Sequence, residues 1–369
     1  MFDISNELRI FFVCLVSSHA IKLTFLRTFI ALADISDRLP IGVPTIYRTP
    51  FSGSWLLYDG GDSLFMIMVK LPSGVNISNL IDDLRCLSWE VSDILLSYAQ
   101  LIRNPNNFSE IITSNKNNDP VTKADLEVNE LIINRINQRY PDVNWNILSE
   151  ENVKQNVDYF NKKSDWLWIL DPLDGTKDFI QGTSNYAVHL ALNYKNKPFL
   201  GIVLLPDRDE LWIANGEYLW CEKRNGTRLN AVMKCKKHLK DMTVLTSKNH
   251  NNKILHDLVQ KINFRETISM GSIGCKITAL LRGEGDIYIT LSLPGKSAPK
   301  DWDFAAPEAI LKAAGGSITN INNEVLKYNQ LSFEHGGIII ASKQKIYHEN
   351  LCLEVKKIVE ENQLYPIDL

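Results

Sequence analysis

The chain has 369 residues, of which 45% are hydrophobic and 22% are charged, and its formal net charge is -3. This is the composition of a globular protein with room for two domains, and the slightly acidic balance argues against a nucleic-acid-binding surface. The six cysteines are far apart and show neither a CxxC motif nor a zinc-ligand spacing, so we expect reduced thiols in a cytoplasmic protein.

Residues 1–65 differ from the rest of the chain. Their two apolar runs are interrupted by Lys22 and Arg27, and no apolar stretch of about 20 residues results. We therefore expect no stable membrane span, although looser membrane association stays open. We interpret this stretch as a poorly structured extension or an upstream addition to the reading frame, with the functional start at Met66 or Met68.

Two amphipathic helices are predicted next. Apolar residues recur at helical spacing over residues 80–101, with Ser78 or Asn76 as the N-cap. A second helix is expected over residues 126–139. The polar segment between them, residues 109–118, is expected to be a mobile loop.

The middle of the chain predicts strands. The apolar run Trp166–Leu170 is expected to be a buried strand that delivers Asp171 and Asp174 onto a sharp turn. Apolar runs with short polar or Gly/Pro connections then predict an antiparallel meander, at 186–193, 199–205, 211–214 and 218–221. From residue 243 strands alternate with helices, as in an α/β domain. We therefore predict an α+β domain over residues 66–242 and an α/β domain over residues 243–369.

Four carboxylate-bearing elements stand out, at Asp125, Glu150, the pair Asp171 and Asp174, and Asp303. Each lies beside a predicted strand end or helix start, and in layered α/β folds such ends gather on one side of a sheet. Carboxylates brought together there without a cation would raise one another's pKa. Because all the ligand atoms are oxygens, the pattern favours Mg²⁺ over zinc.

Each of these elements also has a plainer structural interpretation. Residues 171–175 alone form an Asp-rich capped turn, and Asp303 alone could be a helix N-cap. Thr176 could likewise be a simple helix cap. Strand alternation turns Glu151 away from its neighbour, so we do not expect it to be a ligand, and Asp178 is interpreted as a solvated helix residue.

Four segments in order resemble the signature motifs of the inositol monophosphatase superfamily: Asp119–Asp125, Ser149–Glu151, Asp171–Thr176 and Trp302–Ala306. The segment Lys177–Ile180 is most similar to the bacterial 3′(2′),5′-bisphosphate nucleotidases within that superfamily. The resemblance covers roughly residues 76–342. It implies a layered αβαβα sandwich and a lithium-sensitive phosphatase with two or three Mg²⁺ ions.

The resemblance also implies a role for each residue. The first metal would be held by Glu150, Asp171 and the carbonyl of Leu173, and the second by Asp171, Asp174 and Asp303. Asp125, Thr176 and Glu150 are the expected catalytic residues, the first two orienting the attacking water. The expected substrate contacts are Glu150, Leu173, Asp174, Gly175, Thr176, His250, Ser272, Lys276 and Asp303.

The C-terminal domain is expected to bind the rest of the substrate. Segments 247–250 and 271–276 resemble nucleotidase segments that lie near the nucleotide. Lys276 suits a 5′-phosphate, although it could instead be an exposed helix lysine. The spacing from Gly271 to Lys276 is one residue longer than in the bacterial form.

The expected reaction is hydrolysis of the 3′-phosphate of adenosine 3′,5′-bisphosphate to AMP and phosphate, which in sulfur metabolism clears a by-product of sulfotransfer. The alternatives are an inositol or sugar phosphate phosphatase and, from another class, a catalytically silent phosphate-binding protein. The expected partner is a small phosphate monoester, and the protein is expected to be a monomer or a homodimer.

Overall fold

A computed structural model describes residues 71–103, 112–116, 119–155, 164–216, 218–234, 236–249 and 252–366, together with three short strands before them. The chain divides into two compact units, residues 1–68 and 69–369. The early strands β1 (Ile46–Arg48), β2 (Ser54–Leu57) and β3 (Ile67–Lys70) form one sheet in that order. The other residues of 1–65 lie outside the described part, so their interpretation as an extension stays a prediction.

Within the described residues, the larger unit contains a seven-stranded sheet in the order β12-β11-β10-β9-β8-β7-β6. Neighbouring strands from β7 to β12 are antiparallel, which confirms the predicted meander, and β6 is parallel to β7. The strands are β6 (Asn146–Ser149), β7 (Trp166–Asp174), β8 (Ala187–Tyr194), β9 (Lys197–Leu205), β10 (Glu210–Asn215), β11 (Tyr218–Glu222) and β12 (Arg228–Leu229).

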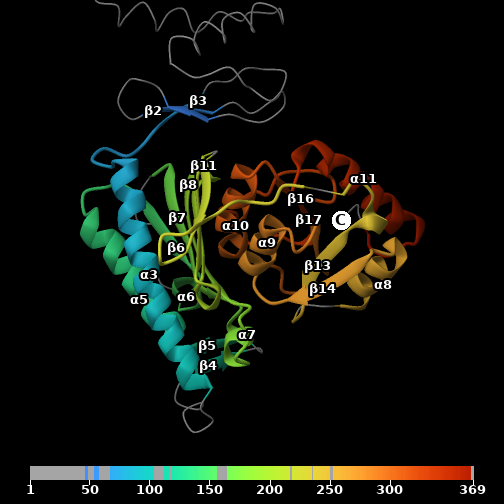
Figure 1. Cartoon of the computed structure of the whole chain (residues 1–369), viewed down its shortest axis with the longest axis horizontal. Coiled ribbons are helices and arrows are strands. Elements are labelled where there is room, and N and C mark those ends of the chain that lie inside the picture. The colour runs from blue at the N-terminus through green and yellow to red at the C-terminus, as the bar shows by residue number, and fades with distance from the viewer. Residues whose placement is uncertain are drawn as a thin grey trace, which may run out of the picture. The chain divides into compact units, whose positions relative to one another are not determined.

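Helices α3 (Ile77–Ile102) and α5 (Lys123–Arg139) cover the outer face of this sheet (Figure 1). The side chain of Asn76 accepts hydrogen bonds from two backbone N–H groups of the first turn of α3, which selects it as the N-cap. The prediction of a mobile loop over residues 109–118 is wrong in part. Residues Ile112–Lys116 form β4, which pairs with β5 (Asp119–Thr122). Their sequence is polar, so no hydrophobic alternation indicated a strand.

A second, five-stranded sheet follows in the order β14-β13-β15-β17-β16. Its strands are β13 (Thr243–Ser247), β14 (Glu266–Met270), β15 (Ile287–Ser292), β16 (Ser317–Asn320) and β17 (Gly337–Ser342). Helices α9 (Ile273–Arg282) and α10 (Asp301–Ala313) lie between the two sheets, and α8 (Lys253–Ile262) and α11 (Lys345–Glu361) cover the far face (Figure 1).

The apolar core follows this arrangement. One cluster joins the inner faces of both sheets through α9 and α10, and another joins the second sheet to α8 and α11. The layers therefore run helix, sheet, helix, sheet, helix, which confirms the predicted αβαβα sandwich. The chain passes from the first sheet to the second between Leu229 and Thr243. Residues 69–369 form one compact unit, so the domain boundary predicted near residue 242 stays a prediction.

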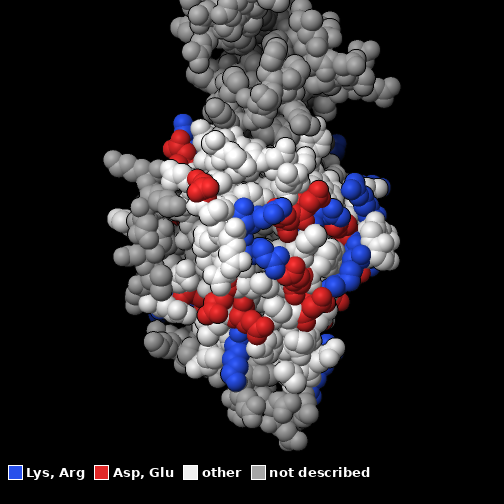
Figure 2. Space-filling view, turned by 90° about the vertical axis from the view of Figure 1, so that its left-hand side faces the viewer, with Lys and Arg blue, Asp and Glu red and all other residues white. Residues whose placement is uncertain are grey.

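Charges of both signs are interspersed on the outer face that α3 and α5 form (Figure 2). Arg135 pairs with Glu90 at 2.6 Å and Arg139 with Asp83 at 2.9 Å. Such a mixture is typical of a solvated surface. None of the helices in the described ranges is both long and apolar enough to cross a bilayer.

His348 of α11 is buried between two hydroxyl groups. Its Nε2 lies 2.8 Å from Thr319 Oγ1 and its Nδ1 lies 2.7 Å from Ser342 Oγ. Burial lowers its pKa from 6.5 to about 4. Between these two values the unfolded chain binds a proton that the folded chain does not, so the free energy of unfolding falls as the pH falls.

His348 is expected to contribute a slope of about 1.4 kcal/mol per pH unit to the free energy of unfolding between pH 6 and pH 4.5. We expect His348→Gln to remove this contribution. Urea unfolding of both proteins at several pH values in this range measures the difference. Equal slopes for wild type and variant would show that this histidine does not couple folding to pH.

Candidate metal centre

The two carboxylates of the central motif lie at the end of β7 and not on a turn after it. Asp171 pairs with His189 of β8, and Asp174 pairs with Ala187. Three residues along β7 therefore match two along β8, which is a β-bulge. The extra residue places both carboxylates on one face of the sheet, where strict alternation would separate them. The predicted turn after Leu170 is wrong, because β7 continues to Asp174.

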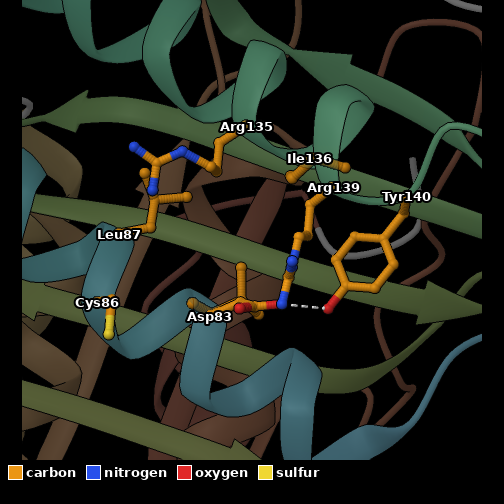
Figure 3. A pocket seen from close by; sticks show the side chains of 8 residues that line it. Asp83, Cys86, Leu87, Arg135, Ile136, Arg139 and Tyr140 are labelled. Atoms are coloured by element: carbon orange, nitrogen blue, oxygen red, sulfur yellow. Dashed lines mark hydrogen bonds and ion pairs between the residues drawn. The ribbon is translucent and has the colours of Figure 1, made fainter.

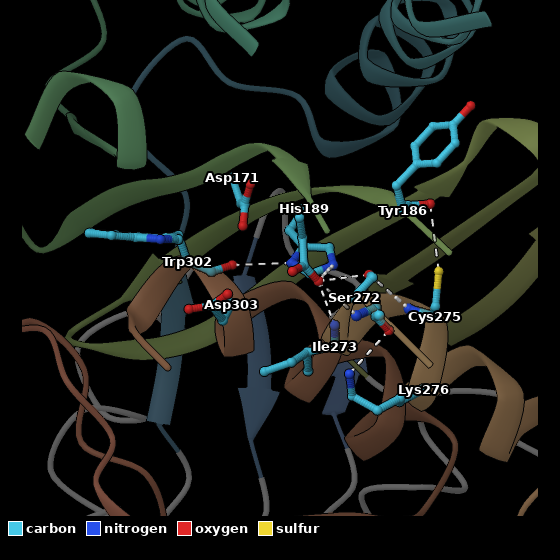
Figure 4. A network of polar contacts seen from close by, with 12 residues as sticks. Asp171, Tyr186, His189, Ser272, Ile273, Cys275, Lys276, Trp302 and Asp303 are labelled. Atoms are coloured by element: carbon cyan, nitrogen blue, oxygen red, sulfur yellow. Dashed lines mark hydrogen bonds and ion pairs between the residues drawn. The ribbon is translucent and has the colours of Figure 1, made fainter. Parts of the chain in front are cut away.

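Asp303 completes a cluster with these two residues. One carboxylate oxygen of each lies within 4.8 Å of the others. Asp303 is the third residue of α10, and its Oδ2 accepts a hydrogen bond from the backbone N–H of Lys300 at 2.6 Å. The N-cap residue itself is Lys300. Asp171 and Asp303 approach one another from β7 and α10 (Figure 4).

Glu150 begins the short helix α6 (Glu150–Lys154) and is not one of the three clustered aspartates, but its carboxyl group is hydrogen-bonded to Asp171. Lys154 lies 2.9 Å from Glu150 and 3.2 Å from Glu151. Strand alternation therefore does not decide the direction of Glu151, because both glutamates belong to a helix turn. The buried Glu151 faces Lys154 and lies outside the three-aspartate cluster.

The cluster without a cation is electrostatically unfavourable. Burial, followed by the charges of Glu150, Asp174 and Asp303, raises the pKa of Asp171 well above its ordinary value. Burial and the neighbouring carboxylates likewise raise the pKa of Asp303 well above its ordinary value. A hard divalent cation would remove this repulsion, and carboxylate oxygens are its preferred ligands. The residues present therefore fit a divalent cation such as Mg²⁺.

Thr176 and Asp125 lie next to these carboxylates. Thr176 begins the short helix α7 (Thr176–Ile180), and its Oγ1 lies 3.2 Å from Asp125 Oδ1 and 3.0 Å from the carbonyl oxygen of Leu173. The other oxygen of Asp125 accepts the backbone N–H of Thr122 at 2.8 Å. Burial raises the pKa of Asp125 to about 7. A hydroxyl group and a carboxyl group able to hold a proton near neutral pH are thus brought together.

Gly175 makes the bend between β7 and α7. Its φ is +91°, a left-handed conformation that side chains rarely adopt. A Cβ at this position would lie 2.7 Å from the carbonyl oxygen of Asn185 and 3.3 Å from the backbone nitrogen of Ser272. Gly175 therefore makes a bend that only glycine adopts without strain, and the bend abuts the backbone of Ser272 from the C-terminal half of the chain.

The residues predicted on the substrate side have mixed outcomes. Ser272 hydrogen-bonds to Asp174 Oδ2 at 2.7 Å. Lys276 is 2% exposed, so its interpretation as an exposed helix lysine is wrong, because α9 is enclosed between the two sheets. Asp178 is also fully buried, which corrects its interpretation as a solvated residue. His250 lies outside the described residues.

His189 carries no motif, and sequence reasoning misses it. It lies in β8, and its Nδ1 is 3.2 Å from the carbonyl oxygen of Trp302 (Figure 4). Its Nε2 is 3.3 Å from Asp174 Oδ2. It therefore connects the residue before Asp303 with Asp174. Its one sequence signal is a histidine inside an apolar run, which more often marks a satisfied core residue.

A pocket of about 260 Å³ lies on α3 and α5 (Figure 3). Its lining residues do not include any member of the acidic cluster. Its one carboxylate, that of Asp83, already accepts hydrogen bonds from Arg139 at 2.9 Å and from the Tyr140 hydroxyl at 2.7 Å. The pocket therefore offers no argument for a second reactive site.

An αβαβα sandwich with clustered carboxylates at strand and helix ends defines a class, that of phosphatases dependent on divalent metal ions. The chain belongs to the inositol monophosphatase family, whose sequence profile matches residues 79–360. It is therefore a phosphatase of that family, as the resemblance predicted.

Two bacterial proteins illustrate the similarity to known relatives. The chain is 29% identical over 219 residues to the 3′(2′),5′-bisphosphate nucleotidase CysQ of Shigella flexneri, which spans 59% of this chain and 82% of that protein. It is 28% identical over 250 residues to CysQ of Aggregatibacter actinomycetemcomitans, and the match covers 66% of this chain and 89% of that protein.

Solved structures agree on the fold. The IMPase of Thermotoga maritima superposes with a TM-score of 0.58 at 24% identity, over 77% of this chain and 99% of that one. An inositol monophosphatase from Zymomonas mobilis superposes with a TM-score of 0.55 at 25% identity, over 74% of this chain and 98% of that one.

Proposed function

We propose that this protein is a Mg²⁺-dependent phosphomonoesterase that removes the 3′-phosphate of adenosine 3′,5′-bisphosphate, giving AMP and phosphate. The observation that carries the type of reaction is the cluster of Asp171, Asp174 and Asp303 beside the Thr176–Asp125 pair. The choice of substrate is supported by the similarity to proteins named 3′(2′),5′-bisphosphate nucleotidase.

Two or three Mg²⁺ ions would be held by the carboxylates of Glu150, Asp171, Asp174 and Asp303 and by the carbonyl of Leu173. When bound, such cations neutralise charge on the phosphoryl oxygens and acidify a water molecule. The contribution of the chain is to hold the three aspartates close together, two of them at the bulged end of β7 and the third in α10.

Thr176 and Asp125 would position the attacking water. The Thr176 hydroxyl lies between a carboxylate oxygen and a carbonyl oxygen, both of which can accept its proton, so its own oxygen can accept a hydrogen bond from water. With a pKa of about 7, Asp125 can take up a proton at neutral pH. The backbone N–H groups of Gly175 and Thr176 would face the phosphate, and direct attack by water requires no phosphorylated enzyme.

Phosphate release measured side by side from adenosine 3′,5′-bisphosphate, inositol 1-phosphate and fructose 1,6-bisphosphate tests the proposal. We expect the highest kcat/KM with the nucleotide and no release in EDTA. A higher kcat/KM with inositol 1-phosphate would replace the proposed substrate while keeping the reaction. The absence of release from all three would instead favour a silent phosphate-binding protein.

A further inference from the structure

The turn Met270–Ser272, between β14 and α9, has an unusual backbone. Ser272 has φ 44° and ψ 130°, in a region that residues other than glycine rarely occupy. Conformations of this kind persist only where the surrounding structure enforces them. The residues that surround this turn therefore hold it in this conformation.

The turn holds one carboxylate of the acidic cluster. Oδ2 of Asp174 accepts the Ser272 hydroxyl at 2.7 Å and the backbone N–H groups of Ile273 and Gly274 at 2.5 and 3.3 Å. The same serine caps α9 by accepting the N–H of Cys275 at 3.1 Å. The orientation of the Asp174 side chain thus depends on the conformation of Ser272, which Figure 4 shows at the start of α9.

On one side, the turn packs against Asp178, which is fully buried. Its carboxylate accepts hydrogen bonds from Asn249 at 2.6 Å and from Thr183 at 2.7 Å, and Lys248 lies 3.5 Å away. A Cβ on Gly271 would lie 2.2 Å from Asp178 Oδ2. Only glycine therefore leaves room for this carboxylate, which joins α7 to the end of β13 and to the turn.

A second buried polar side chain, that of Lys276, holds the turn through the turn's carbonyl groups. Its ammonium group donates to the carbonyl oxygens of Met270 and Gly271 at 3.3 and 3.1 Å. It also lies 5.4 Å from the centre of the Tyr288 ring, within range of a cation–π contact. Burial lowers the pKa of Lys276, and the negative charges of Asp174 and Asp178 act in the opposite direction.

We propose that Asp178 and Lys276 are positioning residues, which hold the Met270–Ser272 turn in its strained conformation so that Ser272 orients Asp174 toward the cation. The inference rests on the proposed function. It assigns Lys276 to the carbonyl groups of the turn and not to a phosphate of the substrate. It also gives a role to the carboxyl group of Asp178, which lies in a position that water does not reach.

The binding of Mn²⁺ alone, followed by the EPR signal of the free ion, tests this inference without substrate. We expect Ser272→Ala, Asp178→Asn and Lys276→Met each to weaken Mn²⁺ binding by roughly 10–100-fold, as other residues that orient metal ligands do. Asp178→Asn keeps the size and shape of the side chain and is expected to keep the fold. Thermal unfolding of each variant reports its stability separately.

A matched control exists in the same unit. Lys343 is also 2% exposed and pairs with Asp286 at 3.2 Å, and neither residue touches the turn. We expect Lys343→Met to lower the melting temperature and to bind Mn²⁺ within about 3-fold of wild type. An equal loss of affinity in this control would overturn the inference, because the effect would then be general destabilisation.

The remaining outcomes are distinct. Wild-type affinity in the Asp178 and Ser272 variants, with or without a raised KM for the nucleotide, refutes the positioning role. A wild-type protein that binds no Mn²⁺ removes the proposed function itself, and this inference with it.

Discussion

Replacing Asp174 with asparagine is expected to lower kcat by at least about 10³-fold, the loss expected when several kcal/mol of charge stabilisation disappear from a metal site. The fold should survive the change. The carboxamide oxygen can still accept the Ser272 hydroxyl and the N–H groups of Ile273 and Gly274, which now bond to Asp174 Oδ2. The amide nitrogen supplies neither a negative charge nor a metal ligand.

The measurement is phosphate release at saturating Mg²⁺, with circular dichroism to show that the variant is folded. Asp93→Asn is the matched control, because Asp93 is an exposed carboxylate that pairs with Arg224 away from the cluster. The control should keep wild-type turnover. An Asp174→Asn enzyme with turnover within 10-fold of wild type would refute the metal assignment.

The elements that sequence predicted well are those with a strong local pattern. The helix α3 and the meander β7–β11 follow from apolar periodicity, and their ends differ from the predicted ones by a few residues. The carboxylates were singled out because each stands beside a predicted strand end or helix start. The bulge in β7 was not predictable, because it depends on how the strand pairs with β8.

The buried charges mark the limit of local reasoning. Helix α7 has five residues, too few for a periodic pattern to show which side is covered. Asp178 is buried by Asn249 and Gly271, which lie about 70 and 90 residues further along the chain. Lys276 is buried because α9 lies between two sheets, and only the assembled layers show this. Long-range packing, and not local propensity, decided both positions.

Asp171→Asn is expected to make the metal-free protein more stable while abolishing turnover. The raised pKa of Asp171 means that its charge is unfavourable in the folded state without a cation. Because the pKa of Asp171 in the folded protein lies above the ordinary value of 3.8, protonation of Asp171 stabilises the fold at low pH. This contribution to the free energy of unfolding is lost as the pH rises through the folded pKa. In EDTA at pH 7.5 we therefore expect the variant to melt roughly 2–8 °C higher than wild type.

Mg²⁺ should reverse this order, because a cation that binds only the folded state stabilises it, by about 2.7 kcal/mol at a concentration 100 times the Kd. Wild type would gain this stabilisation, whereas the variant lacks the carboxylate central to the cluster and would gain little. Differential scanning calorimetry of both proteins, in EDTA and in Mg²⁺, measures whether the order of the two melting temperatures reverses. A wild-type protein that melts at the same temperature with and without Mg²⁺ would contradict the predicted reversal. A variant less stable than wild type in EDTA would show instead that Asp171 stabilises the fold through hydrogen bonds such as the one it accepts from the N–H of Leu173 at 3.0 Å.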